Sequence, residues 1–121
     1  MRTRFQTLIL ICLLVFIPSA SMGQEWEVPE ERAARLSPFE FNESTIAEGS
    51  GIYSTNCLSC HGTPGKSDFQ ALNPLPGDPA DQKMQANSDG SMYYKISGGR
   101  SLMPSFSNVL SPEEIWKVIS Y

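Results

Sequence analysis

The chain has 121 residues and a mass of 13.4 kDa, which is the size of one domain and excludes a multidomain enzyme. Its hydrophobic content of 40% is that of a folded protein, and its formal net charge of −4 at pH 7 makes nucleic acid a poor partner. Nine glycines and nine prolines are many for this length, so long ordered loops are expected. Because a domain this small has a thin apolar core, an additional stabilising element is expected as well.

Residues 1–23 have the order of segments that is typical of a Sec-type signal peptide. Two arginines precede an apolar run, Leu8–Ile17, and small residues follow in 19–23. We expect cleavage before Gln24, which removes Cys12 and leaves an exported chain with a net charge of −6. A retained membrane anchor is the alternative, but this run is much shorter than the ~20 apolar residues that span a bilayer.

Residues 24–43 are rich in Glu and Pro and have no steady apolar period, so they are expected to form a linker or an arm that lies on the domain surface. Three aromatic residues, Trp26, Phe39 and Phe41, are the candidates for holding such an arm in place.

The first helix of the domain is expected over Ser44–Asn56. Thr45 and Glu48 have the spacing of a capping box, and apolar residues recur at helical spacing after them. Gly49 and Gly51 each weaken a helix by roughly 1 kcal/mol relative to Ala, so their presence predicts that another element approaches closely.

Residues 62–79 hold four prolines and three glycines and are predicted to form an irregular loop. A short helix is expected over 79–87 and a better one over 88–97, with Ser88 as its N-cap and Gly98 and Gly99 at its end.

The last helix begins at an unambiguous signal. Ser111 is a capping residue, Pro112 occupies the first helical position and Glu114 completes a capping box. An apolar face follows and is still running at Tyr121, so one interpretation is that the domain, 44–121, continues beyond the printed sequence.

Cys57, Cys60 and His61 form the pattern C-x-x-C-H, which is the attachment signature of c-type haem. The two-residue spacer lets both thiols reach the two vinyl groups on one edge of the porphyrin, and the adjacent imidazole can turn under the ring to bind iron. The same pair as a disulfide would close too small a loop to stabilise a domain.

Two other interpretations of this motif are less consistent with its context. A thiol-disulfide oxidoreductase carries C-x-x-C at a helix N-terminus within a βαβ unit, whereas here the motif follows a predicted helix and no strand precedes it. A zinc site needs four ligands, and His61 is the only histidine while no third cysteine remains after cleavage.

The iron of such a haem needs a sixth ligand or has an open position. Met103 is the first candidate, because it lies in a glycine-flanked loop, 98–106, that Pro104 stiffens. Met84 is the second candidate. Met84 and Met92 both have the helical spacing that is more often typical of core methionines. Ligation by Met and His is the arrangement used for electron transfer.

These residues resemble a class I monohaem cytochrome c of the small bacterial kind. The shared pattern is Gly49-x-x-x-Tyr53-x-x-x-Cys57-x-x-Cys60-His61-Gly62, then Met103-Pro104-x-Phe106 and the final Ser-Pro-Glu-Glu helix, and the likeness covers residues 45–121. It implies an all-α fold in which the N-terminal and C-terminal helices cross near Gly49, and short helices and long loops wrap one covalent haem.

The resemblance also implies roles for individual residues. Cys57 and Cys60 form the thioethers to haem c, and His61 and Met103 bind its iron. A proline carbonyl, from Pro74 or Pro76, accepts the second N–H of the histidine.

The expected function is a periplasmic one-electron carrier between respiratory redox partners, with no catalytic residues of its own and no membrane span in the mature chain. Two alternatives stay open. The chain is a cytochrome c subunit of a larger oxidoreductase complex, associated with the membrane, or it is a haem enzyme or gas-binding protein with an open distal site. The electron donor and acceptor are not identified by the sequence.

Overall fold

The computed structural model describes residues 25–121, and the predicted signal peptide with Cys12 lies outside this range. The described chain contains six helices: α1 (Glu30–Ala33), α2 (Glu43–Asn56), α3 (Leu58–His61), α4 (Gln82–Gln85), α5 (Asp89–Gly98) and α6 (Pro112–Ile119). It has no strand within this range, only an isolated bridge between Arg100 and Met103. The expectation of an all-α fold is confirmed.

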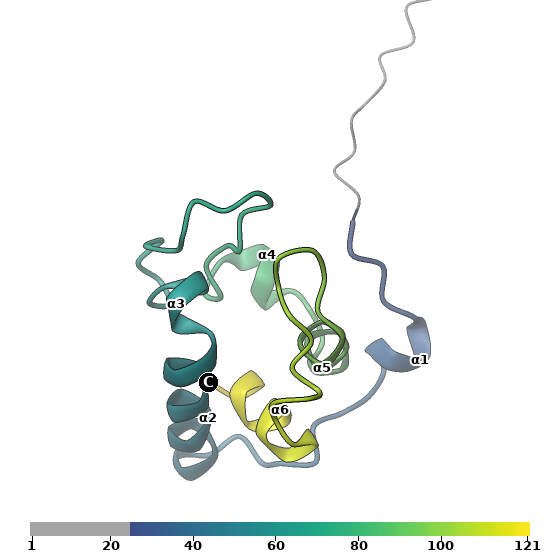
Figure 1. The fold of residues 1–121 in the computed structure, drawn as a ribbon. Helices are drawn as coiled ribbons and strands as arrows, with labels where there is room; N and C mark the ends of the chain where they lie inside the picture. The colour runs from purple at the N-terminus through teal and green to yellow at the C-terminus, as the bar shows by residue number, and fades with distance from the viewer. Residues whose placement is uncertain (1–24) are drawn as a thin grey trace, which may run out of the picture.

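The helices are arranged around the domain rather than stacked in layers (Figure 1). Helices α2 and α3 form one side and α5 the other, while the loop after α3 and helix α4 lie above and α6 lies below. No helix of residues 25–121 combines the length and the apolar character that a membrane span requires.

Helices α2 and α6 cross in direct contact, as the resemblance implied. A Cβ placed on Gly49 would lie 2.1 Å from the backbone oxygen of Lys117, so only glycine permits this approach. The rings of Tyr53 and Tyr121 lie 5.3 Å apart at the same crossing. Gly51 is different, since nothing lies within 4 Å of its ideal Cβ, and the prediction of a close approach there is wrong.

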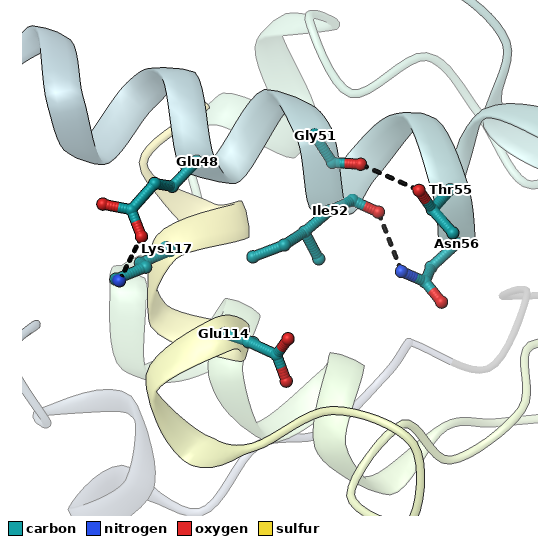
Figure 2. A pocket seen from close by; sticks show the side chains of 7 residues that line it. All are labelled: Glu48, Gly51, Ile52, Thr55, Asn56, Glu114 and Lys117. Carbon is teal, nitrogen blue, oxygen red and sulfur yellow. Dashed lines mark hydrogen bonds and ion pairs between the residues drawn. The ribbon is translucent and has the colours of Figure 1, made fainter.

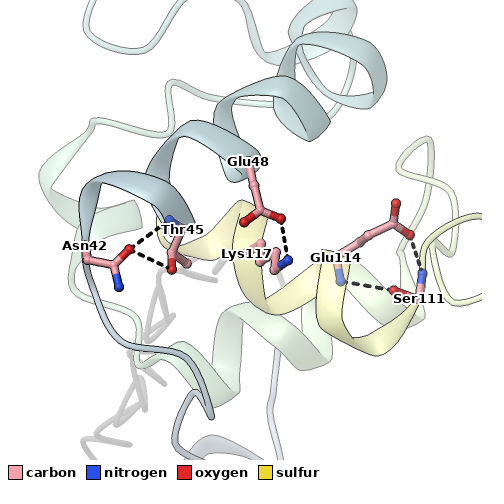
Figure 3. A network of polar contacts seen from close by, with 6 residues as sticks. All are labelled: Asn42, Thr45, Glu48, Ser111, Glu114 and Lys117. Atoms are coloured by element: carbon pink, nitrogen blue, oxygen red, sulfur yellow. Dashed lines mark hydrogen bonds and ion pairs between the residues drawn. The ribbon is translucent and has the colours of Figure 1, made fainter.

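Two of the three predicted side-chain caps are present, and Figure 3 shows the caps of α2 and α6. Ser111 and Glu114 form the predicted capping box of α6, and Ser88 accepts a hydrogen bond from the Ser91 N–H at the start of α5. The predicted box at Thr45 is wrong. Asn42 caps α2 instead, accepting from the Thr45 backbone N–H at 3.0 Å, and α2 therefore begins at Glu43.

The buried core is small and centres on α6. Ile115 is 1% exposed, and the other buried hydrophobic residues of the described chain are Tyr53, Phe106, Leu110, Trp116 and Val118. Five partly buried hydrophobic residues pack against the cluster of Phe106, Leu110 and Ile115: Ile52, Tyr93, Ile96, Met103 and Ile119.

Residues 25–43 pack along α5 and α6 and contain the short helix α1. Ser88 donates a hydrogen bond from its hydroxyl to the Ala33 carbonyl at 2.7 Å. The Arg35 guanidinium lies 4.6 Å from the ring centre of Tyr93 and 5.2 Å from that of Trp116. These contacts attach the segment to the same aromatic pair that joins α5 to α6.

The aromatic residues of this segment differ in their surroundings. Trp26 lies beneath the charged groups of Lys95 and Arg100, at 5.8 and 5.6 Å from its ring centre, and Phe39 lies 5.4 Å from the Lys117 ammonium. Phe41 is 79% exposed, so the expectation that it holds the arm in place is wrong.

Candidate haem-binding site

Helices α2 and α3 bring the C-x-x-C-H residues together at one corner of the domain. Cys57 is both the C-cap of α2 and the N-cap of α3, and its N–H donates to the Tyr53 carbonyl at 2.8 Å. One helical turn later the His61 N–H donates to the Cys57 carbonyl at 2.9 Å. Gly62, with φ of +69°, then ends the helix. The motif therefore occupies a single turn in which its side chains start close together.

Both thiols of the motif are free and partly buried. Burial, with a smaller contribution from Cys60, raises the pKa of the Cys57 thiol to about 11. This thiol is therefore protonated near neutral pH. Redox-active C-x-x-C pairs instead depend on a cysteine whose pKa is lowered, so the structure argues against the oxidoreductase interpretation.

The His61 ring makes a hydrogen bond that defines which nitrogen is available. Its Nδ1 lies 3.1 Å from the carbonyl oxygen of Gly77. Because a carbonyl can only accept, Nδ1 carries the proton and the neutral ring keeps its lone pair on Nε2. An imidazole fixed in this way is prepared to bind a metal through Nε2.

The identity of this acceptor corrects one expectation. The acceptor is the carbonyl of Gly77, whereas the resemblance implied that of Pro74 or Pro76. Gly77 has φ of +74°, a conformation that turns its peptide toward the histidine and that a residue with a Cβ rarely adopts. The prolines thus lie before the turn that directs the carbonyl, and their own carbonyls are not the partners of His61.

The segment between His61 and Gly77 is an irregular loop, as predicted, and buried polar contacts hold it. Tyr53 donates from its hydroxyl to the Gly62 carbonyl at 2.7 Å, and burial raises the pKa of this hydroxyl above its ordinary value. The Asp78 side chain accepts from backbone N–H groups on both sides of the loop. No motif of the sequence singled out Asp78, although an acidic residue directly after a turn glycine is a recognisable signal.

The three candidate methionines lie in different surroundings. Met103 is half-buried in the loop after α5, where Arg100 and Met103 exchange two backbone hydrogen bonds of 2.9 and 3.0 Å. It packs against the core cluster of Phe106, Leu110 and Ile115. Met84, in α4, has its methyl group 3.7 Å from the ideal Cβ position of Gly77. Met92 is partly buried within α5.

An open groove of about 450 Å³ lies between α2 and α6 (Figure 2). Its lining consists of Glu48, Gly51, Ile52, Thr55, Asn56, Glu114 and Lys117. Glu48 and Lys117 form an ion pair across its rim, and the Ile52 side chain points toward α6. None of the motif residues or the candidate methionines lines this groove, so it is separate from the candidate site.

The residues present fit haem c. Two free thiols and an imidazole with an available Nε2 share one helical turn. Only six hydrophobic residues of the described chain are buried, which leaves a domain of this length short of the apolar core that it needs. No cluster of three or more His, Cys, Asp or Glu side chains suited to a bare metal ion occurs within residues 25–121, so the zinc interpretation has no support there.

Comparison with known proteins identifies the same chemistry. Residues 44–121 match the family described as cytochrome c oxidase, cbb3-type, subunit III. Cytochrome c6 of Nostoc sp. is 34% identical over 91 residues, which cover 71% of this chain and 79% of that protein. Cytochrome c6 of Parathermosynechococcus lividus is 29% identical over 76 residues, covering 63% of this chain and 85% of that protein.

A longer relative and a solved structure also match. The 1-butanol dehydrogenase (cytochrome c) of Thauera butanivorans is 31% identical over 105 residues, which are 84% of this chain but 15% of that enzyme. The crystal structure of cytochrome c6 from the diatom Phaeodactylum tricornutum is 28% identical, covers 63% of this chain and 87% of that one, and superposes with a TM-score of 0.48. Since the family match extends over most of the chain, this protein belongs to the cytochrome c family, as a small monohaem c-type cytochrome that carries haem c with its iron and transfers electrons.

Proposed function

We propose that this protein is an exported carrier of single electrons between redox partners of the periplasm, and that it has no substrate site at its iron. Cys57 and Cys60 would hold haem c through thioether bonds, and His61, through Nε2, and the sulfur of Met103 would bind its iron. The bound group supplies an iron that alternates between Fe(III) and Fe(II), one electron at a time. With His61 and Met103 as its two protein ligands, the iron would keep no open position for a substrate or gas.

The observation that carries the proposal is the separation of the two leading methionines. Met84 lies beside Gly77, whose carbonyl holds His61, so it belongs to the histidine side of the site. Met103 belongs to the cluster formed by the loop after α5 and helix α6. Two axial ligands must approach the iron from opposite faces of the ring, and this requirement favours Met103 over Met84.

The axial ligands are tested by absorption spectroscopy of the holoprotein. The oxidised wild type is expected to show the weak far-red band of a sulfur–iron(III) bond, which disappears in Met103→Ala and persists in Met84→Ala. Loss of the band in Met84→Ala alone would reverse the assignment. Rapid binding of carbon monoxide by the reduced wild type would instead support the open distal site of a haem enzyme or gas-binding protein.

Export and the extent of the domain are tested on the protein purified from its host. We infer that residues 1–23 are a signal peptide and that residues 44–121 form the cytochrome domain, preceded by the arm. N-terminal sequencing of the red, mature protein is expected to begin at Gln24. A mature chain that still begins at Met1 and sediments with membranes would support the retained anchor.

A second candidate function is that of a cytochrome c subunit or domain of a larger oxidoreductase. The observation in its favour is the similarity to the dehydrogenase of Thauera butanivorans, of which this chain spans only 15%. Size-exclusion chromatography of a fresh periplasmic extract, followed at the haem absorption maximum, separates the two. A single peak at the mass of the mature monomer supports the free carrier, whereas haem absorption that co-elutes with a large oxidoreductase supports the subunit.

A further inference from the structure

One buried carboxylate organises the loop that carries the hydrogen-bond partner of His61. We propose that Asp78 is a positioning residue for the haem ligand: its carboxylate fixes the Gly77 peptide, and through it the orientation and donor strength of the His61 imidazole. The inference rests on the proposed role of His61 as an iron ligand.

The Asp78 side chain connects two segments of the loop that are more than ten residues apart. It is only 7% exposed. One oxygen accepts from the N–H of Gly65 at 2.9 Å and from that of Ala80 at 2.8 Å, and the other accepts from Gly65 at 3.0 Å and from Ser67 at 2.9 Å. Three backbone N–H groups therefore converge on one carboxylate.

These bonds favour the ionised form. They hold the pKa of the Asp78 carboxyl below its ordinary value, with the bond from Gly65 as the largest cause and the bond from Ala80 next. The side chain is therefore charged at neutral pH, and hydrogen bonds to a charged acceptor are about twice as strong as neutral ones.

The position of Asp78 in the chain connects this cluster to the histidine. It directly follows Gly77, whose carbonyl accepts from His61 Nδ1 at 3.1 Å. The segment 62–81 has no helix or strand of its own, so hydrogen bonds of this kind must fix its shape. Ala80 follows shortly after the same turn, and Gly65 and Ser67 lie shortly after His61. The carboxylate thereby ties the segment that follows His61, the hydrogen-bond donor, to the segment that carries the acceptor, the Gly77 carbonyl.

The position of the Gly77 carbonyl affects the properties of the His61 imidazole. A hydrogen bond from Nδ1 sets the tautomer, restricts rotation of the imidazole and makes Nε2 a stronger electron donor. If the Gly77 carbonyl moves, His61 keeps its place in the sequence but loses both the orientation and the added basicity. The expected signature of losing Asp78 is thus a local weakening of this one hydrogen bond.

The test is hydrogen exchange of the His61 Nδ1 proton, measured by NMR on the reduced holoprotein. Asp78→Asn keeps the size of the side chain but directs an NH₂ group at backbone donors, and it is expected to accelerate this exchange about ten-fold or more. Asp78→Glu keeps the charge and displaces the oxygens by one methylene. It is expected to accelerate exchange as well, and it serves as the second variant if Asp78→Asn yields too little holoprotein.

Asp81→Asn is the matched control, because it removes one negative charge three residues away. The Asp81 carboxylate caps α4 by accepting from Lys83 N–H at 2.8 Å, and Asn caps a helix equally well. The amide of Ile115, 1% exposed in α6, reports on global opening. The proposal is supported if exchange accelerates at His61 but not at Ile115, and if this happens in the Asp78 variants but not in Asp81→Asn.

Two results would overturn it: unchanged exchange at His61 in both Asp78 variants, or equal acceleration at His61 and Ile115, which indicates global destabilisation. If the proposed function itself is wrong, the spectrum of the wild type shows it. In that case the wild type itself lacks a His61 ring proton shifted by a neighbouring haem, whereas failure of the Asp78 role leaves this resonance in place and removes only the difference between variants.

Discussion

The crossing of α2 and α6 depends on the absence of a side chain at Gly49. In Gly49→Ala the new Cβ meets the Lys117 backbone oxygen at 2.1 Å and the Lys117 carbonyl carbon at 2.9 Å, while ordinary contact begins at 3.4 Å. The obstructing atoms are backbone, so a rotamer change cannot relieve the overlap. The helices have to separate by roughly 1 Å or more, which disturbs the contact between Tyr53 and Tyr121.

The size of the effect follows from two opposing contributions. Overpacking of a well-packed interface costs about 1–3 kcal/mol, and an overlap with backbone belongs at the upper end of that range. Replacing Gly by Ala within a helix stabilises the folded protein by roughly 1 kcal/mol, because Ala has the higher helix propensity. The expected net loss in the free energy of unfolding is about 2 kcal/mol, which corresponds to a fall of roughly 8–16 °C in Tm for a domain of this size.

Gly51→Ala is the matched control, because it lies in the same helix and nothing is within 4 Å of its ideal Cβ. Gly51→Ala gains the higher helix propensity of Ala without a steric overlap of the new Cβ, so it is expected to raise Tm by a few degrees. The assay is thermal unfolding of the two holoproteins, followed by far-UV circular dichroism. A Gly49→Ala protein as stable as the wild type, or as stable as Gly51→Ala, would refute the reasoning.

Three further predictions concern the arm, a helix cap and pH. Arg35→Ala is expected to lower the free energy of unfolding by about 1 kcal/mol in urea titrations, because it loses contact with two aromatic rings, and an equal loss in the exposed Arg32→Ala would contradict this. Ser111→Ala is expected to cost about 1 kcal/mol in the same assay, whereas Ser111→Asn retains a cap and most of the stability. Because the folded-state pKa of Asp78 is lowered, its stabilisation is complete above about pH 4 and is lost as pH falls below that value. Urea titrations across this pH range should therefore show a weaker acid dependence in Asp78→Asn than in the wild type, and parallel curves would contradict the prediction.

Features that depend on a few consecutive residues could be predicted from the sequence. The capping box of α6 and the cap of α5 need only residues three positions apart, so local geometry decides them. The C-x-x-C-H motif is similar, because five consecutive residues place two sulfurs and an imidazole on one turn wherever that turn lies. The family and its cofactor follow from this motif and its context.

Competition between local alternatives was decided by tertiary contacts. Thr45 and Glu48 have capping-box spacing, yet Glu48 forms an ion pair with Lys117 of α6, and Asn42 becomes the cap (Figure 3). The sequence pattern treats both possibilities alike, since it holds no information on which side chain has a partner from another helix.

What the sequence by itself determined is therefore the all-α class, the haem-attachment turn and the caps whose partners are neighbours in the chain. Only the tertiary structure decided that Gly77 rather than a proline faces His61, that Asp78 gathers the loop around that contact, and that the arm packs on α5 and α6. The reason is physical. These contacts join residues far apart in the chain across irregular segments, where a positive φ or a buried carboxylate redirects the backbone and no periodic pattern reports the result.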